Sequence, residues 1–344
     1  MATAPASCAI VALATPVVRR LAVAKGVVDQ PGGHKSHHTP VPYLGGLAIM
    51  LGAVGAHVAI VGVAGRTAVI LLAAVMLGLV GAVDDRRNIH PLPRLAAQLA
   101  AALAAVAVGV EVHITGNHVI DRFATVVWIV AMTNALNFLD NMDGLASGIA
   151  AASAACAFVL ASAARQSVVA TAASALVGAC LGFLIYNRRP ASIYMGDAGS
   201  LFLGYLLAVV VVQVDPAQTT PRSWLVPALL LGIPVLDTTT VMLMRWRNGR
   251  ALYLGGRDHL SHRLLALGWA PTDAVLTLVG CQVLLGGLAV LTGRGFLPLW
   301  AALAAAAMTL GGLLLLCLTA MVYPQIHPGP EANESADDQG GPVY

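Results

Sequence analysis

The sequence predicts an all-α, polytopic membrane protein with about eleven transmembrane helices. Of the 344 residues, 58% are hydrophobic and only 10% are charged, whereas a soluble domain carries about 25% charged residues. The mean hydropathy is +0.81. Apolar blocks of helix length alternate with short polar joints, and no alternating strand pattern competes with them. These features exclude a soluble α/β or all-β enzyme, and nothing indicates a nucleic-acid partner.

The apolar blocks divide the chain into its predicted spans. A helix needs about 20 residues, within a range of about 17–25, to cross the hydrocarbon core, so the first block is short and the eighth is weak. Together the blocks form a single membrane domain, residues 1–322, while the acidic residues 323–344 are expected to form a disordered tail. The blocks lie near residues 2–18, 43–64, 67–83, 95–111, 123–139, 145–164, 168–186, 200–214, 224–244, 273–292 and 296–322.

The Lys and Arg residues in the joints predict the orientation. With the N-terminus outside, the inner joints carry 14 of the 19 Lys and Arg residues, as the positive-inside rule requires. Every joint with an unusual polar motif then also lies on the inner side. We therefore expect the N-terminus outside and the tail and the catalytic loops on the cytoplasmic face.

Polar residues recur at every third position where the fifth block ends: Asn134, Asn137, Asp140 and Asp143. Insertion of a carboxylate at the centre of a membrane helix costs about 2.5–3.5 kcal/mol of free energy, so the presence of these groups needs an explanation. One reason is a polar helix end that reaches the interface. The other is a ligand site: if Gly144 ends the helix near Asp140, we expect all four groups to converge on one pocket.

Further acidic groups lie in two other inner joints. Asp84 and Asp85 are adjacent carboxylates, which suit Mg²⁺ shared with substrate phosphates, although adjacent acids also cap helices. Asp197 lies between Gly196 and Gly199, in a turn that can present a carboxylate and backbone N–H groups to a metal and a phosphate. A simple Asp N-cap is the alternative.

The last inner joint carries His259, Ser261, His262 and Arg263. His-x-x-His can form a Zn²⁺ pair, but there is no third Cys or His ligand nearby, and the many Arg residues favour phosphate contact or a solvated basic loop. Acids, basic groups and Gly-rich turns at one membrane face indicate Mg²⁺-assisted chemistry on a phosphorylated substrate. The sequence has no GxxxxGK[ST] motif, which argues against ATP hydrolysis.

Together and in this order, these motifs resemble the polyprenyl-phosphate N-acetylhexosamine-1-phosphate transferase family, glycosyltransferase family 4. The resemblance implies transfer of a sugar-1-phosphate from a UDP-sugar to the membrane lipid polyprenyl phosphate, with release of UMP and with Mg²⁺, or else Mn²⁺, as cofactor. It implies a multi-pass enzyme of the bacterial inner membrane that initiates a cell-envelope glycan, such as lipopolysaccharide, teichoic acid or the arabinogalactan linker. A homodimer is compatible with it.

The resemblance also implies roles for individual residues. Asp84 and Asp85 match the acidic pair, with Asp84 orienting or deprotonating the lipid phosphate, and Asp197 matches a Mg²⁺ ligand; all three are candidate catalytic and metal-binding residues. Asp140 and Asp143 are candidate catalytic residues that shape the nucleotide site, with Asp143 placed to recognise uracil. Direct in-line attack is preferred to an aspartyl-phosphate intermediate. The candidate substrate-binding residues are Lys35, His37, Asn134, Asn137, Asn187, His259, His262 and Arg263; Asn187 and Asp237 match family-like patterns without an assigned task.

The chain departs from the family pattern at two places. Ser261 replaces the middle histidine of the late motif, and Asn141-Met142 replaces a more usual Gly-Leu between the two aspartates. Because the muramyl-pentapeptide branch has a run of histidines in the late motif, the N-acetylglucosamine-1-phosphate branch is the closer match, and the phospho-muramyl-pentapeptide activity is the alternative. Two alternatives belong to other functional classes: an ion-coupled secondary transporter and a catalytically silent scaffold.

Overall fold

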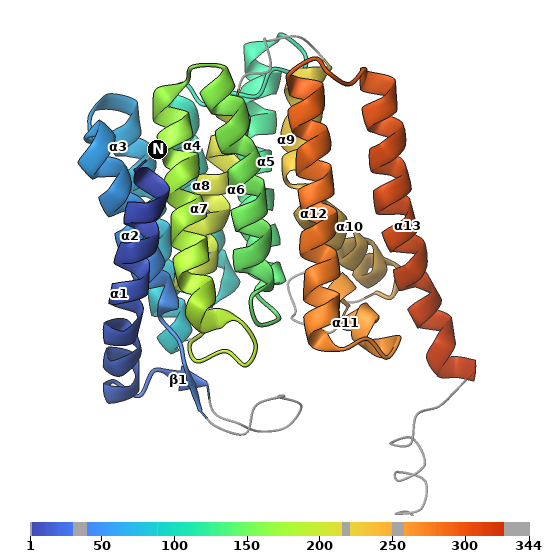
Figure 1. The fold of residues 1–344 in the computed structure, drawn as a ribbon, viewed down its shortest axis with the longest axis horizontal. Coiled ribbons are helices and arrows are strands. Elements are labelled where there is room, and N and C mark those ends of the chain that lie inside the picture. The colour runs from blue at the N-terminus through green and yellow to red at the C-terminus, as the bar shows by residue number, and fades with distance from the viewer. Residues whose placement is uncertain (1, 30–39, 88, 215–220, 250–257, 327–344) are drawn as a thin grey trace, which may run out of the picture.

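The computed structural model describes residues 2–29, 40–87, 89–214, 221–249 and 258–326. Within these residues the protein is a bundle of helices with one small antiparallel strand pair (Figure 1). The helices are α1 (Thr3–Ala24), α2 (Gly45–Val61), α3 (Gly65–Arg87), α4 (Pro91–Ala107), α5 (His118–Leu139), α6 (Leu145–Ala163), α7 (Ser167–Asn187), α8 (Gly196–Gln213), α9 (Arg222–Leu230), α10 (Gly232–Arg247), α11 (Leu260–Ala266), α12 (Pro271–Gly293) and α13 (Leu299–Ile326), and the strands are β1 (Val28–Asp29) and β2 (Val41–Pro42).

The predicted polytopic, all-α membrane architecture is confirmed. Among the described residues, eight helices are long and apolar enough to cross a membrane, and the bent pair α9–α10 makes a ninth if it is counted as one span. The 17-residue helices α2 and α4 are shorter, and they lie at two further expected positions. The count of eleven spans and the orientation remain predictions.

Several helix ends differ from the predicted blocks. α1 has 22 residues instead of a short span, because it continues through Arg19 and Arg20. α13 continues to Ile326, so it includes the first four residues of the expected tail; residues 327–344 lie outside the described part. α5 ends at Leu139, and Gly144 has a left-handed φ of 79°, which confirms the predicted helix end near Asp140.

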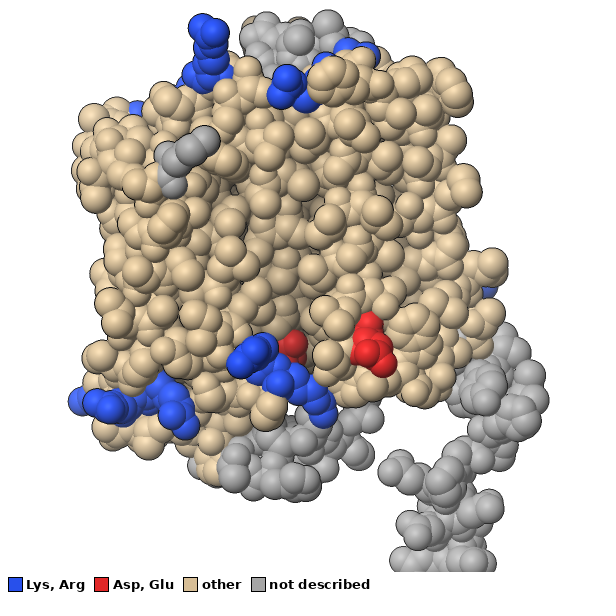
Figure 2. Space-filling model, viewed as in Figure 1, with Lys and Arg blue, Asp and Glu red and all other residues tan. Residues whose placement is uncertain are grey.

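The central helix of the bundle is α8. Of its membrane-spanning residues, 83% are buried, compared with 22% for α1, and α8 packs against α3 and α5. The strand pair, the α5–α6 turn, the α7–α8 loop and α11 all lie at one end of the bundle (Figure 1). On the face drawn in Figure 2, Lys and Arg gather mostly at the two ends, with a broad band of other residues between them. The motif-bearing joints therefore share one end, as the sequence predicted.

The break between α9 and α10 is stabilised by a side chain from another helix. The two helices are bent by 80°, so the continuous span expected over residues 224–244 is wrong. The buried Gln282 of α12 accepts a hydrogen bond from the backbone N–H of Ile233 at 3.0 Å and donates to the carbonyl of Leu230 at 2.9 Å. Because hydrocarbon offers no partner to a free backbone group, Gln282 makes the break tolerable.

We predict that Gln282→Leu lowers the free energy of unfolding by about 2 kcal/mol or more, because a buried polar group without a partner costs about 1–3 kcal/mol. Thermal unfolding in detergent measures this loss. Gln213→Leu is the matched control, since Gln213 bonds Arg66 on the exposed surface and its loss should cost about 0.5 kcal/mol or less. Equal stability of Gln282→Leu and the wild type would contradict the role given to Gln282.

Candidate active site

Close packing of α3 against α8 brings three acids together. A Cβ atom on Gly81 of α3 would overlap the backbone carbonyl of Asp197, so only glycine permits this approach. Asp84 and Asp85 follow Gly81 by about one helical turn and therefore lie beside the N-terminus of α8. Residues separated by more than 100 positions in the sequence thus meet at one end of the bundle.

Asp85 caps the N-terminus of α8. One carboxylate oxygen accepts a hydrogen bond from the backbone N–H of Asp197 at 2.7 Å, and the other accepts from that of Ala198 at 3.2 Å. A negative charge at a helix N-terminus also interacts favourably with the helix dipole. Both oxygens of Asp85 accept backbone hydrogen bonds that position Asp197. Among the described residues, Asp84 accepts only one such bond, at Oδ1 from the N–H of Ile89 at 2.8 Å, so Oδ2 of Asp84 and the Asp197 carboxylate are the better candidates for a metal.

Asp84 and Asp197 share a cationic partner in Arg94 of α4. Nη1 of Arg94 lies 2.9 Å from Oδ2 of Asp84 and 3.1 Å from Oδ2 of Asp197. The side chains are 8% exposed for Asp84 and 29% for Asp197, so the pair is shielded yet reachable from solvent. In the sequence, Arg94 is only one of many basic residues. Its position one turn into an apolar helix was the one feature that could have indicated a functional role.

The same two carboxylate oxygens suit a divalent cation. Both point to one place, where the Arg94 guanidinium now lies, and both are hard oxygen donors of the kind Mg²⁺ prefers. The second oxygen of Asp197 accepts a hydrogen bond from the Asn137 amide at 2.6 Å, which fixes the carboxylate. Asp84 and Asp197 therefore fit a Mg²⁺ ion held at the end of the bundle.

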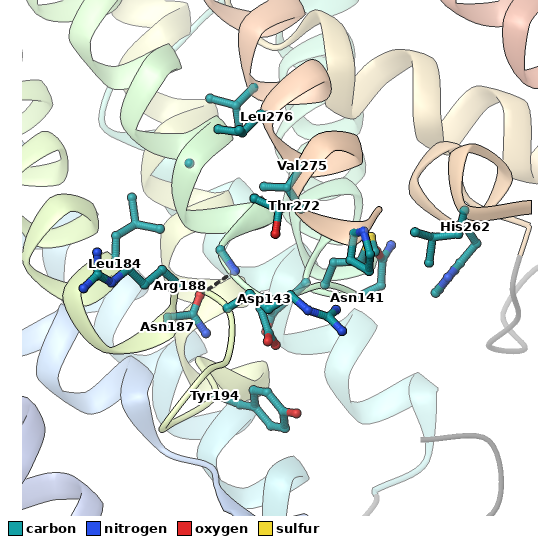
Figure 3. A pocket seen from close by; sticks show the side chains of 18 of the residues that line it. Asn141, Asp143, Leu184, Asn187, Arg188, Tyr194, His262, Thr272, Val275 and Leu276 are labelled. Carbon is teal, nitrogen blue, oxygen red and sulfur yellow. Dashed lines mark hydrogen bonds between the residues drawn. The ribbon is translucent and has the colours of Figure 1, made fainter. Parts of the chain in front are cut away.

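A cavity of about 1050 Å³ lies at the same end of the bundle. Figure 3 shows Asp143, Asn187 and Tyr194 in this cavity, with Asn141 between Asp143 and His262. One wall is polar and comes from the α5–α6 turn, the α7–α8 loop and α11; the other is apolar and comes from α7 and α12. The lining includes Asp29, Tyr43, Asp140, Asn141, Asp143, Leu184, Asn187, Arg188, Arg189, Tyr194, His262, Val275, Leu276 and Val279.

Asn187 has a positioning task that the sequence did not reveal. Its buried side chain accepts hydrogen bonds from the Gly144 N–H at 3.1 Å and the Ser147 hydroxyl at 3.4 Å, and it donates to the Ile193 carbonyl at 3.1 Å. The Asp143 carboxylate strengthens the same junction by accepting from the backbone N–H of Ala191 at 3.1 Å. The α5–α6 turn and the α7–α8 loop therefore form one rigid wall.

Asp140 carries an unusual charge environment. Burial, and after it the repulsion from the nearby carboxylates of Asp197, Asp85 and Asp143, together raise the pKa of Asp140 to about 8. A carboxyl group whose pKa is raised this strongly by burial and by neighbouring acids is typical of functional sites.

The expected convergence of all four Asn and Asp side chains on one pocket is wrong. Asn134 faces α4, where its amide exchanges hydrogen bonds with Gln98 at 2.6 and 3.3 Å, while Asn137 faces α8. Neither is among the described residues that line the cavity. Steps of three residues drift by about 60° around a helix, so only Asp140 and Asp143, which lie beyond the last turn, reach the cavity.

The late motif is anchored by Asp237 of α10. This fully buried carboxylate contacts Nδ1 of His259 at 2.7 Å and accepts from the backbone N–H of Leu260 at 2.7 Å. Arg263 is also buried, and its Nε donates to the Asp258 carbonyl at 2.9 Å. Of the three late residues predicted to bind substrate, the structure places only His262 in the cavity lining. Lys35 and His37 lie outside the described residues.

Comparison with known proteins supports the resemblance. The model of the glycosyl transferase family 4 matches residues 67–215, which span α3 to α8. A Bacillus subtilis (strain 168) protein named "Probable undecaprenyl-phosphate N-acetylglucosaminyl 1-phosphate transferase" is 32% identical over 78% of each chain. The decaprenyl-phosphate N-acetylglucosaminephosphotransferase of Mycobacterium tuberculosis (strain CDC 1551 / Oshkosh) is 33% identical over 76% of this chain and 75% of its own. The undecaprenyl-phosphate alpha-N-acetylglucosaminyl 1-phosphate transferase of Yersinia pestis is 27% identical over 84% and 83%.

The matched segment contains the three acids at the α3–α8 contact, the α5–α6 turn and the α7–α8 loop. The Bacillus subtilis and Mycobacterium tuberculosis relatives, both above 30% identity, extend the similarity over three quarters of this chain. The chain belongs to glycosyl transferase family 4.

Proposed function

We propose that this enzyme transfers N-acetylglucosamine-1-phosphate from UDP-N-acetylglucosamine to polyprenyl phosphate, giving polyprenyl-diphospho-N-acetylglucosamine and UMP. The observation that carries the proposal is the convergence of Asp84, Asp197 and Arg94 at the end of the bundle that also holds a nucleotide-sized cavity. The names of the relatives support the lipid acceptor and the sugar. The Lys and Arg distribution supports a site on the cytoplasmic face of the membrane, which we propose to be a bacterial inner membrane.

The proposed reaction needs positioning and charge neutralisation. An oxygen of the lipid phosphate attacks the β-phosphorus of the donor, a new P–O bond forms, and the bond from this phosphorus to the bridging oxygen breaks, so that UMP leaves with the bond's electron pair. A Mg²⁺ ion held by Asp84 and Asp197 would neutralise the diphosphate charge. Direct attack is sufficient, because aligned groups and preorganised charges supply most of the rate enhancement.

The chain's own residues divide the remaining tasks. Arg94 contacts both acids through a single nitrogen, so its other donors are left for phosphate oxygens, which guanidinium binds well. Asp143 and Arg188 line the cavity, and we propose that they contact the uridine half of the donor. The acids lie at the ends of helices, whereas transporters place such groups near the membrane midplane, so we do not propose a transporter.

We predict that the purified protein releases UMP from UDP-N-acetylglucosamine only when polyprenyl phosphate and Mg²⁺ are present, and that EDTA abolishes the release. Asp197→Asn should lower kcat about 100-fold or more, because charge stabilisation is the largest contribution to such reactions. Glu111→Gln is the matched control, since Glu111 pairs with Arg122 at the opposite end of the bundle. The absence of UMP release with every UDP-sugar in a panel would overturn the proposed function.

We also predict that Arg94→Gln lowers kcat/KM about 10- to 100-fold, because a hydrogen bond to a charged group contributes about 1.5–3 kcal/mol. Arg94→Lys should recover part of the loss, since lysine restores the charge without the planar fork. Mg²⁺ should raise the melting temperature of Arg94→Gln more than that of the wild type, because the two acids have lost their cationic partner. Unchanged kcat/KM together with an unchanged Mg²⁺ effect would rule out this role.

A further inference from the structure

A side-chain hydrogen bond joins the α5–α6 turn to α11. The hydroxyl of Ser261 donates to Oδ1 of Asn141 at 2.8 Å, and Ser261 is fully buried. The amide nitrogen of Asn141 donates in turn to the carbonyl of Phe138 at 2.7 Å, one of the carbonyls left free where α5 ends. Asn141 thus connects the last turn of α5 with the first turn of α11.

This contact lies between two walls of the cavity. Asn141 lines the cavity from one side, and His262, the residue after Ser261, lines it from another. α11 has only seven residues, and Asp237 holds its opposite side through His259 and the Leu260 N–H. Among the hydrogen bonds of the described residues, the Asn141–Ser261 bond links α11 to the α5–α6 turn directly beside His262.

Asn141 and Ser261 also lie at the two places where the sequence departs from the pattern of the family that it resembles, and the structure brings them into direct contact. A glycine at position 141 would leave the buried Ser261 hydroxyl without this partner, which costs free energy. A histidine at position 261 is larger than serine and would need space that the Asn141 side chain fills. Each residue is therefore suited to the other.

We propose that Asn141 and Ser261 form a specificity-determining pair, which fixes His262 against the sugar-diphosphate part of the donor and sets the width of the cavity there. The inference rests on the proposed function, whose donor it concerns. Neither residue needs to touch the reacting phosphorus; both act through the position of α11. Their loss should therefore change donor binding and donor choice more than the rate of the chemical step.

The first experiment is a double-mutant cycle with Ser261→Ala, Asn141→Ala and the combined variant. Each single variant should raise the KM for UDP-N-acetylglucosamine about three- to tenfold, as the loss of one hydrogen bond predicts, with kcat changed about twofold or less. The combined variant should be no worse than the poorer single variant, because one interaction is lost in all three. Ser7→Ala is the control: it removes an equally buried hydroxyl with a 2.8 Å bond to the Ala175 carbonyl, between α1 and α7, and should leave KM unchanged.

The second experiment exchanges the pair. Asn141→Gly and Ser261→His should each raise KM, whereas the combined variant should return to within about twofold of the wild-type KM, since the larger ring then has room. The ratio of kcat/KM for UDP-N-acetylglucosamine to that for UDP-N-acetylgalactosamine should differ between the combined variant and the wild type. An unchanged ratio would show that the pair does not determine specificity.

Additive effects of the two alanine substitutions, or a wild-type KM in Ser261→Ala, would overturn the inference while leaving the proposed function intact. If the wild type releases no UMP from any UDP-sugar, the proposed function fails instead. The contact between Asn141 and Ser261 can then be tested without an activity assay. The melting temperatures of the wild type, the two alanine variants and the combined variant provide this test. Non-additive losses of stability are expected from a direct contact, and additive losses would contradict it.

Discussion

The contact between Asp85 and the N-terminus of α8 is the interaction on which the candidate site depends. α8 is the most buried span, and its first residues include Asp197. Because Gly81 lets α3 approach the backbone of Asp197, Asp85 can accept two backbone hydrogen bonds there. This places Asp84 beside Asp197 and gives Arg94 two acids to bridge. A shift of α8 along α3 would separate all three groups together.

Buried polar side chains secure the other parts of the same end. Asn187 joins the α5–α6 turn to the α7–α8 loop, Asp237 holds α11, and Gln282 holds the break that sets the direction of α10. In a membrane such groups are costly unless they are paired, and each of these is paired. Polar groups that look like substrate contacts in the sequence thus serve partly to hold loops in place, which leaves fewer residues free for a ligand.

The sequence predicts what depends on composition and on neighbouring residues. The membrane fold follows from the apolar blocks, and the end of α5 follows from Gly144 and its acidic neighbours. The Arg94 bridge, the contact of Asn134 with Gln98 of α4 and the bend at Leu231 were not predicted, because each depends on packing between distant segments. The bend is stabilised by a residue 49 positions away from Ile233, and only Pro227 and Pro234 hint at it in the sequence.

The charges at the α3–α8 contact also bear on the proposed reaction, in which a divalent cation and the donor would bind together. Asp84, Asp197 and Arg94 sum to one negative charge, which repels a diphosphate. A divalent cation held by the two acids would change this sum to one positive charge and would release Arg94 toward the phosphates. Because the acids are shielded from water, these interactions are stronger than they would be in bulk solvent. In the proposed reaction, the same geometry would therefore disfavour the donor alone and favour the donor with a bound divalent cation.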